Sequence, residues 1–340
     1  MEKDKILLNV TNLQTVFRTY AGKVKALNDV TFSVGFGEAL GIVGESGSGK
    51  SVTMLSIMDL LSENGQIVNG EIIFNNKSIR NLKNQEIQAL RGNEIGMIFQ
   101  DPMTSLNPVF TVGTQLIEAV LKHNKITKEE AEAKAIDMLR LVGIPEPEKR
   151  LRQYPHQFSG GMRQRAMIAM SLSCTPKLLI ADEPTTALDV TIQAQILELM
   201  KELMRKINMS IILITHDMGI VADICERVIV MYGGIIVEQG KVDDIFYRPL
   251  HPYTTGLLKC MPRLNLGHER LKPIEGQPPD MINLPAGCPF AARCSYTMKI
   301  CLKQKPPYIE TPEGQGIACW MQYKCLVIDK QEQNAVERSM

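Results

Sequence analysis

The stretch Gly44-Glu45-Ser46-Gly47-Ser48-Gly49-Lys50-Ser51 fits the pattern of a glycine, four residues and then Gly-Lys-Ser. It follows the apolar run 39–43, which predicts a buried strand, and it precedes residues 52–61, which we expect to form a helix. Glycines let the backbone curl so that its N–H groups and the helix N-terminus point at one anion. The stretch therefore predicts an α/β fold of the phosphate-loop type, with a nucleotide phosphate bound at residues 44–51.

The side chains of this loop suggest how it would bind ATP. Lys50 would reach the β- and γ-phosphates, and the hydroxyl of Ser51 would bind Mg²⁺. The other candidate ATP contacts in the loop are Ser46, Gly47, Ser48 and Gly49. Upstream, residues 17–22 are expected to form a turn that carries Phe17 and Tyr20. Such a ring could stack on an adenine or simply pack against the protein.

Length and composition limit the class of protein. A chain of 340 residues predicts two domains, and 44% hydrophobic residues suit a globular core. The 38 Lys and Arg nearly balance the 37 Asp and Glu, so we expect no nucleic-acid partner. We find no apolar run near the roughly 18–20 residues that span a bilayer, and no secretory signal. The eight cysteines are therefore expected to be reduced thiols in the cytoplasm.

The chain changes character several times after its first strands. Residues 30–34 alternate apolar and polar side chains, which predicts a half-buried antiparallel strand. Residues 71–74 and 95–99 read as further strands. From about 101 to 175 helices are expected, one of them opened by the capping box that Thr127 forms with Glu130.

A strand–helix–strand unit follows and predicts a parallel sheet. The strand at 178–181 ends in Asp182-Glu183, and the next strand, at 211–215, ends at His216. Chemistry in such sheets lies at the carboxyl ends of the strands. Asp182 would hold Mg²⁺ through water, Glu183 would polarise the attacking water, and His216 would contact the γ-phosphate.

Ser159-Gly160-Gly161 marks a second helix N-terminus, with Ser159 as the N-cap. It is either an ordinary helix cap or a second anion site. A single triphosphate does not need two such sites in one chain. We therefore expect this one to serve the nucleotide bound by a partner subunit.

Taken together, these motifs resemble the ATP-binding subunits of ABC transporters over roughly residues 5–245. The matching segments, in the order of that family, are the loop at 44–51, Gln100, 158–162, 178–183, 187–189 and His216. The resemblance implies an antiparallel β subdomain, a parallel-sheet core and a helical subdomain. Met162 departs from the commonest pattern, which has glutamine there.

The resemblance also implies roles for particular residues. Glu183 would be the general base, and Gln100 would approach Mg²⁺ and couple the site to the membrane subunits. Phe17, with Tyr20 as the reserve, would stack on the adenine. Ser159, Gly160, Gly161 and Asp189 would meet ATP on the opposite subunit.

The end of the chain narrows the resemblance. The segments 251–254, 276–279 and 287–294 resemble the C-terminal extension of oligopeptide and dipeptide uptake ATPases in the peptide and nickel family, and the chain is most similar to those of dipeptide transport. We therefore expect an ATP-binding domain over 1–250 and a loop-rich extension over 251–340.

Four cysteines of this extension form a possible metal site. Cys288, Cys294, Cys301 and Cys319 are spaced more widely than most structural zinc ligands. Thiolates at such spacing can hold a [4Fe–4S] cluster, which some relatives carry here. We expect that cluster, with zinc as the alternative and ordinary reduced thiols as the third possibility.

The resulting expectation is an ATP hydrolase that powers import of dipeptides or oligopeptides from the cytoplasmic side of the cell membrane, as a peripheral protein. Its partners would be two membrane permeases, a second ATPase subunit (homologous or identical), and indirectly an extracytoplasmic peptide-binding protein. The same ATPase could instead serve nickel or another solute. A soluble ABC ATPase outside transport is the remaining alternative.

Overall fold

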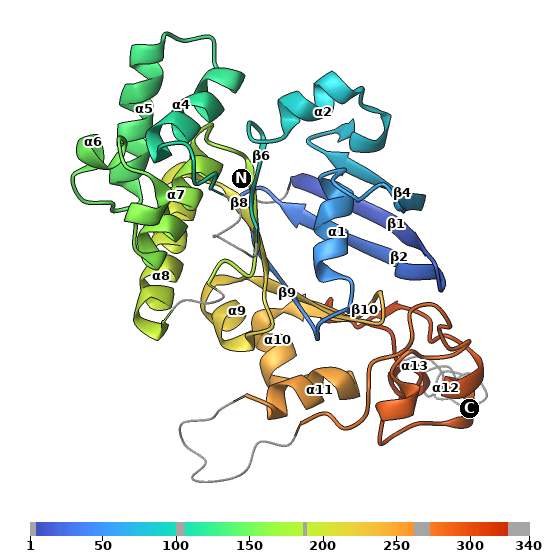
Figure 1. The fold of residues 1–340 in the computed structure, drawn as a ribbon. Coiled ribbons are helices and arrows are strands. Elements are labelled where there is room, and N and C mark those ends of the chain that lie inside the picture. Colours follow the sequence, from blue (N-terminus) through green and yellow to red (C-terminus); the bar gives the residue numbers. More distant parts are fainter. Residues whose placement is uncertain (1–4, 100–105, 186–188, 262–272, 326–340) are drawn as a thin grey trace. The chain divides into compact units, whose positions relative to one another are not determined.

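The computed structural model describes residues 5–99, 106–185, 189–261 and 273–325. The chain forms two compact units. The first comprises Met1–Leu8, Val34–Ala39 and Phe74–Ile214, and the second comprises Asn9–Ser33, Leu40–Ile73 and Thr215–Met340. Among the described residues, no helix is both long enough and apolar enough to cross a membrane. Figure 1 labels the elements along the chain.

Long antiparallel strands carry the N-terminal part of the second unit. β1 (Ile6–Thr19) and β2 (Gly22–Gly35) are joined by a two-residue turn, and β4 (Gly65–Phe74) lies on the other side of β1. The strand predicted at 30–34 is confirmed as part of β2. The turn predicted at 17–22 is wrong at its start, because β1 continues to Thr19. Phe17 packs so closely on Gly65 that a Cβ there would lie 2.6 Å from its ring.

The predicted strand, loop and helix around residues 44–51 are confirmed in the second unit. β3 (Ala39–Val43) is wholly buried and pairs in parallel with β9 (Arg227–Tyr232). The helix after the loop, α1 (Lys50–Ile57), is shorter than predicted. Asp59 adopts a left-handed φ of 50°, a backbone conformation that stops a helix.

The C-terminal extension joins the sheet of the second unit. β9 pairs antiparallel with β10 (Ile235–Lys241), and β10 pairs antiparallel with β12 (Gly316–Ile317), which also pairs with β11 (Ile309–Glu310). Two helices of the second unit precede the extension, namely α9 (Met218–Ile224) and α10 (Val242–Tyr247). The other elements of the extension are α11 (Pro252–Lys259), the 3-10 turn η3 (Ala291–Arg293), α12 (Lys299–Lys303) and α13 (Trp320–Tyr323). The loop-rich texture expected here is present, but the sheet pairing was not foreseen. The division at residue 250 stays a prediction.

The parallel sheet predicted from the strand–helix–strand pattern lies in the first unit. β6 (Ile95–Ile98), β7 (Leu178–Asp182) and β8 (Ser210–Ile214) are neighbours in that order and run in parallel. α8 (Val190–Ile207) connects β7 to β8. β7 and β8 are entirely buried, which explains their unbroken apolar sequences.

Helices make up the middle of the first unit and lie together in Figure 1. They are α4 (Val112–His123), α5 (Lys128–Leu141), α6 (Pro147–Arg150), the 3-10 turn η2 (Pro155–Gln157) and α7 (Gly160–Leu172). Earlier in this unit come β5 (Lys77–Ser78), the 3-10 turn η1 (Ile79–Asn81) and α2 (Asn84–Leu90). The predicted capping box is confirmed, because Thr127 accepts from the N–H of Glu130 and Glu130 accepts from the N–H of Thr127.

Candidate nucleotide site

The backbone of the loop at 44–51 has the curvature that phosphate binding needs. Its three glycines have positive φ angles, of 151° at Gly44, 77° at Gly47 and 107° at Gly49. Residues with a side chain rarely adopt such angles. The third glycine leads directly into α1, so the N-terminus of this helix faces the interior of the loop.

Two side chains of the loop are buried in positions suited to an anionic ligand. The ammonium of Lys50 donates to the carbonyl oxygens of Gly44 at 2.7 Å and Glu45 at 2.9 Å. The hydroxyl of Ser48 is buried and has no hydrogen-bond partner among the described residues. A buried hydroxyl without a partner is costly, which favours a ligand contact there. Ser46 and Gly47 are exposed, and Ser51 is half-buried.

His216 lies in the same unit as this loop. It is exposed and directly follows Thr215, whose N–H donates to the carbonyl of Ile42 in β3 at 3.2 Å. Because β3 runs into the loop, this hydrogen bond places His216 near the carboxyl end of that strand. The position agrees with the predicted contact to a terminal phosphate, which stays a prediction.

Asp182 and Glu183 lie at the carboxyl end of β7 in the first unit. Asp182 is buried, whereas Glu183 is half-buried and has a left-handed φ of 48°. The N–H of Glu183 donates to the carbonyl of Ile214 at the end of β8. Strained backbone of this kind costs about 1–3 kcal/mol and concentrates at functional sites. Glu183, which the sequence proposed as the general base, is one of nine non-glycine residues with a positive φ in the described part of the chain.

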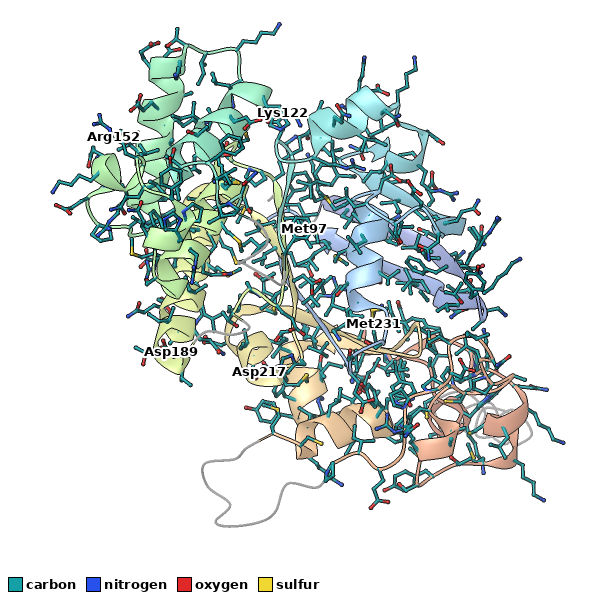
Figure 2. All side chains as sticks on the ribbon, in the orientation of Figure 1. Met97, Lys122, Arg152, Asp189, Asp217 and Met231 are labelled. Atoms are coloured by element: carbon teal, nitrogen blue, oxygen red, sulfur yellow. The ribbon has the colours of Figure 1, made fainter. Side chains whose placement is uncertain are left out.

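The residues expected to act on a partner's nucleotide are brought together in the first unit. Ser159 caps α7 by accepting from the N–H of Met162, as predicted, and Asp189 caps α8 by accepting from the N–H of Ile192. Figure 2 labels Asp189 at the start of α8. A Cβ on Gly161 would lie 2.9 Å from the Ile192 side chain, so the first turns of α7 and α8 are in contact. Gly160 has open space around it.

The two candidates for adenine stacking differ in exposure. Phe17 is half-buried against Gly65, whereas Tyr20 is fully exposed at the tip of the hairpin. Gln100, predicted to approach Mg²⁺, lies outside the described residues, as do Ala187 and Leu188.

The four cysteines of the extension line one small cavity. Cys288, Cys294, Cys301 and Cys319 surround a space of about 20 Å³ that is walled largely by apolar side chains. Burial, together with the other three sulfurs, raises the pKa of the Cys288 thiol to about 11. However, no three His, Cys, Asp or Glu side chains within the described ranges are arranged to hold a metal ion. The expected metal site is therefore not preformed, although its donors converge. No disulfide joins any of the eight cysteines, all of which lie in the described part of the chain.

The sequence did not reveal three polar contacts that support the site. Gln164 of α7 donates to the carbonyl of Pro184, the residue after Glu183. In the second unit, Arg293 and Tyr253 contact Glu45. Glu45 occupies a position of the loop pattern that any residue can take, so its type carried no signal.

Comparisons with known proteins agree with this geometry. The family model described as "ABC transporter" matches residues 27–186, and that described as "Oligopeptide/dipeptide transporter, C-terminal region" matches residues 237–301. Among solved structures, the ATP-binding cassette MJ0796, a dimer bound to ADP and Pi, has a TM-score of 0.62 at 27% identity. That match covers 69% of this chain and 98% of the other. CbiO1 from Clostridium perfringens has the same TM-score at 30% identity, covering 72% and 91%.

Curated relatives match over nearly the whole chain. The oligopeptide transport ATP-binding protein OppD of Bacillus subtilis is 57% identical, covering 93% of this chain and 88% of its own length. The dipeptide transport ATP-binding protein DppD of the same organism is 54% identical, covering 95% and 96%. OppD of Escherichia coli is 53% identical, covering 92% and 93%. The chain therefore belongs to the family of ABC transporter ATP-binding proteins, in its oligopeptide and dipeptide transport branch.

Proposed function

We propose that this protein hydrolyses ATP to power uptake of oligopeptides or dipeptides through membrane permeases. One observation carries the proposal: the curled loop around Lys50 occurs in the same chain as a C-terminal region of the oligopeptide and dipeptide transporter type. The loop would bind the ATP whose hydrolysis provides the energy. The cargo is inferred from relatives that are named for oligopeptide and dipeptide transport. By its likeness to these ATP-binding subunits, the chain would act as a peripheral subunit on the cytoplasmic side of its permeases.

In this proposal the loop holds the triphosphate. Lys50 leaves its carbonyl partners for the β- and γ-phosphates, and Ser48 donates its buried hydroxyl to a phosphate oxygen. Ser51, Asp182 and Gln100 are the residues that would hold Mg²⁺. When bound, Mg²⁺ neutralises charge on the β- and γ-oxygens. The exposed Tyr20 or the half-buried Phe17 stacks on the adenine.

Glu183 is the proposed general base. Its carboxylate accepts the proton of the attacking water as that water adds to the γ-phosphorus and the bridging β–γ oxygen leaves with ADP. The left-handed backbone of Glu183 sets the direction in which its side chain leaves the main chain. The hydrogen bond from Gln164 holds the carbonyl of Pro184, which directly follows Glu183. His216 donates to a γ-phosphate oxygen.

A second ATPase subunit, either homologous or a further copy of this chain, completes the proposed site. Ser159, Gly160 and Gly161 begin a 13-residue helix whose N-terminus attracts anions, and Asp189 begins the helix packed against it. This pair of helix starts would meet ATP held by the opposite subunit. The dimer of MJ0796 bound to ADP and Pi supports such an arrangement. Two permeases and, indirectly, an extracytoplasmic peptide-binding protein are the other partners.

We also propose that the four cysteines bind a [4Fe–4S] cluster. Four thiols converging on one apolar cavity are the donor set that such a cluster takes. The cavity of about 20 Å³ holds roughly one water, so cluster binding must widen it. Cluster binding would cross-link the loops of the extension. Anaerobic purification followed by iron and acid-labile sulfide analysis is expected to give equal amounts of both. Stoichiometric zinc, or no metal, would overturn this assignment.

Reconstitution tests the function as a whole. The chain is placed with its permeases and second ATPase in lipid vesicles, with a peptide-binding protein on the opposite side from the ATPases. We expect ATP turnover to rise when a short peptide is added, and the peptide to accumulate. Stimulation by nickel but not by any di- to pentapeptide would refute the cargo. Brisk turnover that does not require the permeases or depend on protein concentration would refute the transport role.

A further inference from the structure

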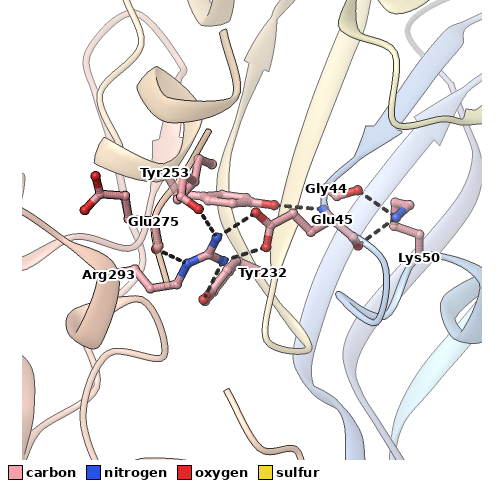
Figure 3. Close-up of polar contacts among 8 residues, drawn as sticks. Gly44, Glu45, Lys50, Tyr232, Tyr253, Glu275 and Arg293 are labelled. Atoms are coloured by element: carbon pink, nitrogen blue, oxygen red, sulfur yellow. Dashed lines mark hydrogen bonds and ion pairs between the residues drawn. The ribbon is translucent and has the colours of Figure 1, made fainter. Parts of the chain in front are cut away.

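The C-terminal extension contacts the phosphate loop at Glu45 through a partly buried ion pair. Nη1 and Nη2 of Arg293 donate to the two carboxylate oxygens of Glu45 at 2.6 and 3.0 Å, as drawn in Figure 3. The Arg293 side chain is 4% exposed, and that of Glu45 is 27% exposed. A bidentate arginine–carboxylate pair that is largely shielded from water is strong, and it fixes the orientation of the carboxylate as well as its distance from the guanidinium.

Arg293 is itself held in place by the extension and by Tyr232 of β9. Its Nε donates to the carbonyl of Glu275 at 2.9 Å, its Nη2 to the carbonyl of Ile274 at 3.0 Å, and its Nη1 to the hydroxyl of Tyr232 at 3.2 Å. The guanidinium also lies 5.7 Å from the centre of the Tyr232 ring. Its position is therefore set before any nucleotide arrives, and Glu45 must adapt to it.

Tyr253 in α11 fixes the backbone of the same residue. Its hydroxyl accepts a hydrogen bond from the N–H of Glu45 at 2.8 Å. The ring is fully buried and packs against those of Tyr232 and Phe290, at centroid distances of 4.6 and 5.3 Å. Burial raises the pKa of the Tyr253 hydroxyl, so the group stays neutral. The extension thus holds Glu45 by both its carboxylate and its N–H.

The backbone carbonyl of Glu45 connects this residue to the side chain that is proposed to bind the phosphates. Its carbonyl oxygen accepts from Lys50, the residue proposed to bind the phosphates (Figure 3). A carboxylate inside an anion-binding loop would also repel ATP unless it is neutralised. Arg293 supplies the neutralising charge and cannot lose its proton at physiological pH.

We propose that Arg293 and Tyr253 are positioning residues of the phosphate loop, through which the C-terminal extension sets the affinity for MgATP. Without Arg293, Glu45 would present an unbalanced charge near the phosphates, and the carbonyl that holds Lys50 would lose its support. The inference rests on the proposed role of the loop at 44–51.

A double-mutant cycle on the full-length chain tests this proposal. Arg293→Gln is expected to weaken binding of a fluorescent MgATP analogue about tenfold, the scale of one lost hydrogen bond to a charged group. In a Glu45→Gln background the same change should add less than about twofold, because the charge to be neutralised is gone. Raising the salt concentration should shrink the defect of Arg293→Gln. Arg293→Lys keeps the positive charge but loses the paired hydrogen bonds to the carboxylate, so its affinity for MgATP should lie between those of the wild type and Arg293→Gln.

The matched control is Arg248→Gln. Arg248 lies in the same unit, pairs with Asp244 and is 68% exposed. Its loss removes an arginine–carboxylate pair elsewhere and should leave the affinity within about twofold. Lys50→Ala tests the proposed function of the loop separately from the role of Arg293. If this variant binds MgATP as well as the wild type does, the loop at 44–51 is not the phosphate site. Lost binding in Lys50→Ala with normal binding in Arg293→Gln would overturn only the present inference.

Folding is checked separately, since a buried arginine can be needed for stability. Tyr253→Phe keeps the ring and removes only the acceptor for the N–H of Glu45, so it should fold and bind MgATP a few-fold more weakly. If Arg293→Gln does not fold, unchanged affinity in Tyr253→Phe and Arg293→Lys would still refute the proposal. Equal losses from Arg293→Gln in both Glu45 backgrounds would refute it as well, because the effect would not pass through Glu45.

Discussion

Replacing Gly44 by alanine should destabilise the loop, and the contacts of the added Cβ give the size of the effect on the free energy of unfolding. A Cβ at this position would lie 2.3 Å from the carbonyl oxygen of Met231 and 2.8 Å from the hydroxyl of Ser48. At Gly47, whose φ is also positive, a Cβ would meet nothing within 4 Å. Both alanines carry the cost of a left-handed backbone, about 1–2 kcal/mol. Only Gly44→Ala adds overpacking, for about 1–3 kcal/mol more.

We therefore expect the free energy of unfolding to fall by about 2–5 kcal/mol for Gly44→Ala and by about 1–2 kcal/mol for Gly47→Ala. Trp320 is the single tryptophan of the chain and belongs to the same unit, so its fluorescence during urea titration reports this unfolding. Met231, labelled in Figure 2, belongs to β9, a central strand that cannot easily shift. Equal losses of unfolding free energy in the two variants would show that the contact with Met231 adds no cost at Gly44.

Three further predictions follow from local contacts. Thr127→Ala should lower the free energy of unfolding by about 1 kcal/mol by removing a helix cap, while MgATP affinity stays unchanged; a larger loss of affinity than of stability would contradict this. Burial raises the pKa of the Glu238 carboxyl, so its stabilising contribution is complete at low pH and is lost as the pH rises above about 4.5. Urea titrations between pH 4.5 and 7.5 should show that this decline is smaller in Glu238→Gln, and an unchanged slope would count against it. Gln164→Leu should slow ATP turnover severalfold with little change in MgATP affinity, because Pro184 loses its donor; turnover equal to the wild type would remove Gln164 from the site.

The sequence predicted those parts of the site that depend on local pattern. The loop from Gly44 to Ser51 has a fixed spacing, and its flanking strand and helix have clear apolar periodicity. The caps at Thr127 and Ser159 depend on residues three positions away, so short-range chemistry was enough to find them. The strands before Glu183 and His216 are continuous apolar runs, which a buried parallel sheet requires.

What the sequence could not predict depends on contacts between distant segments. β1 continues through Phe17, whose ring lies against Gly65, 48 positions further along the chain. Arg293 and Glu45 are 248 positions apart, and the patterns to which they belong do not indicate that the two residues meet. β12 pairs with β10 although it has only two residues, too few for any periodicity. The cysteine spacing indicated convergence, but sequence alone does not determine the geometry of the sulfurs.

Hydrolysis of ATP by this chain is proposed to use Glu183 as the general base. The most direct test of this role compares Glu183→Gln with the wild type in the assembled transporter, measuring MgATP affinity and steady-state turnover together. We expect affinity within about threefold of the wild type and turnover reduced about 10²–10⁴-fold, the usual contribution of a general base. Glu148→Gln, an exposed acid on α6, is the matched control and should change neither. Undiminished turnover in Glu183→Gln would contradict the account.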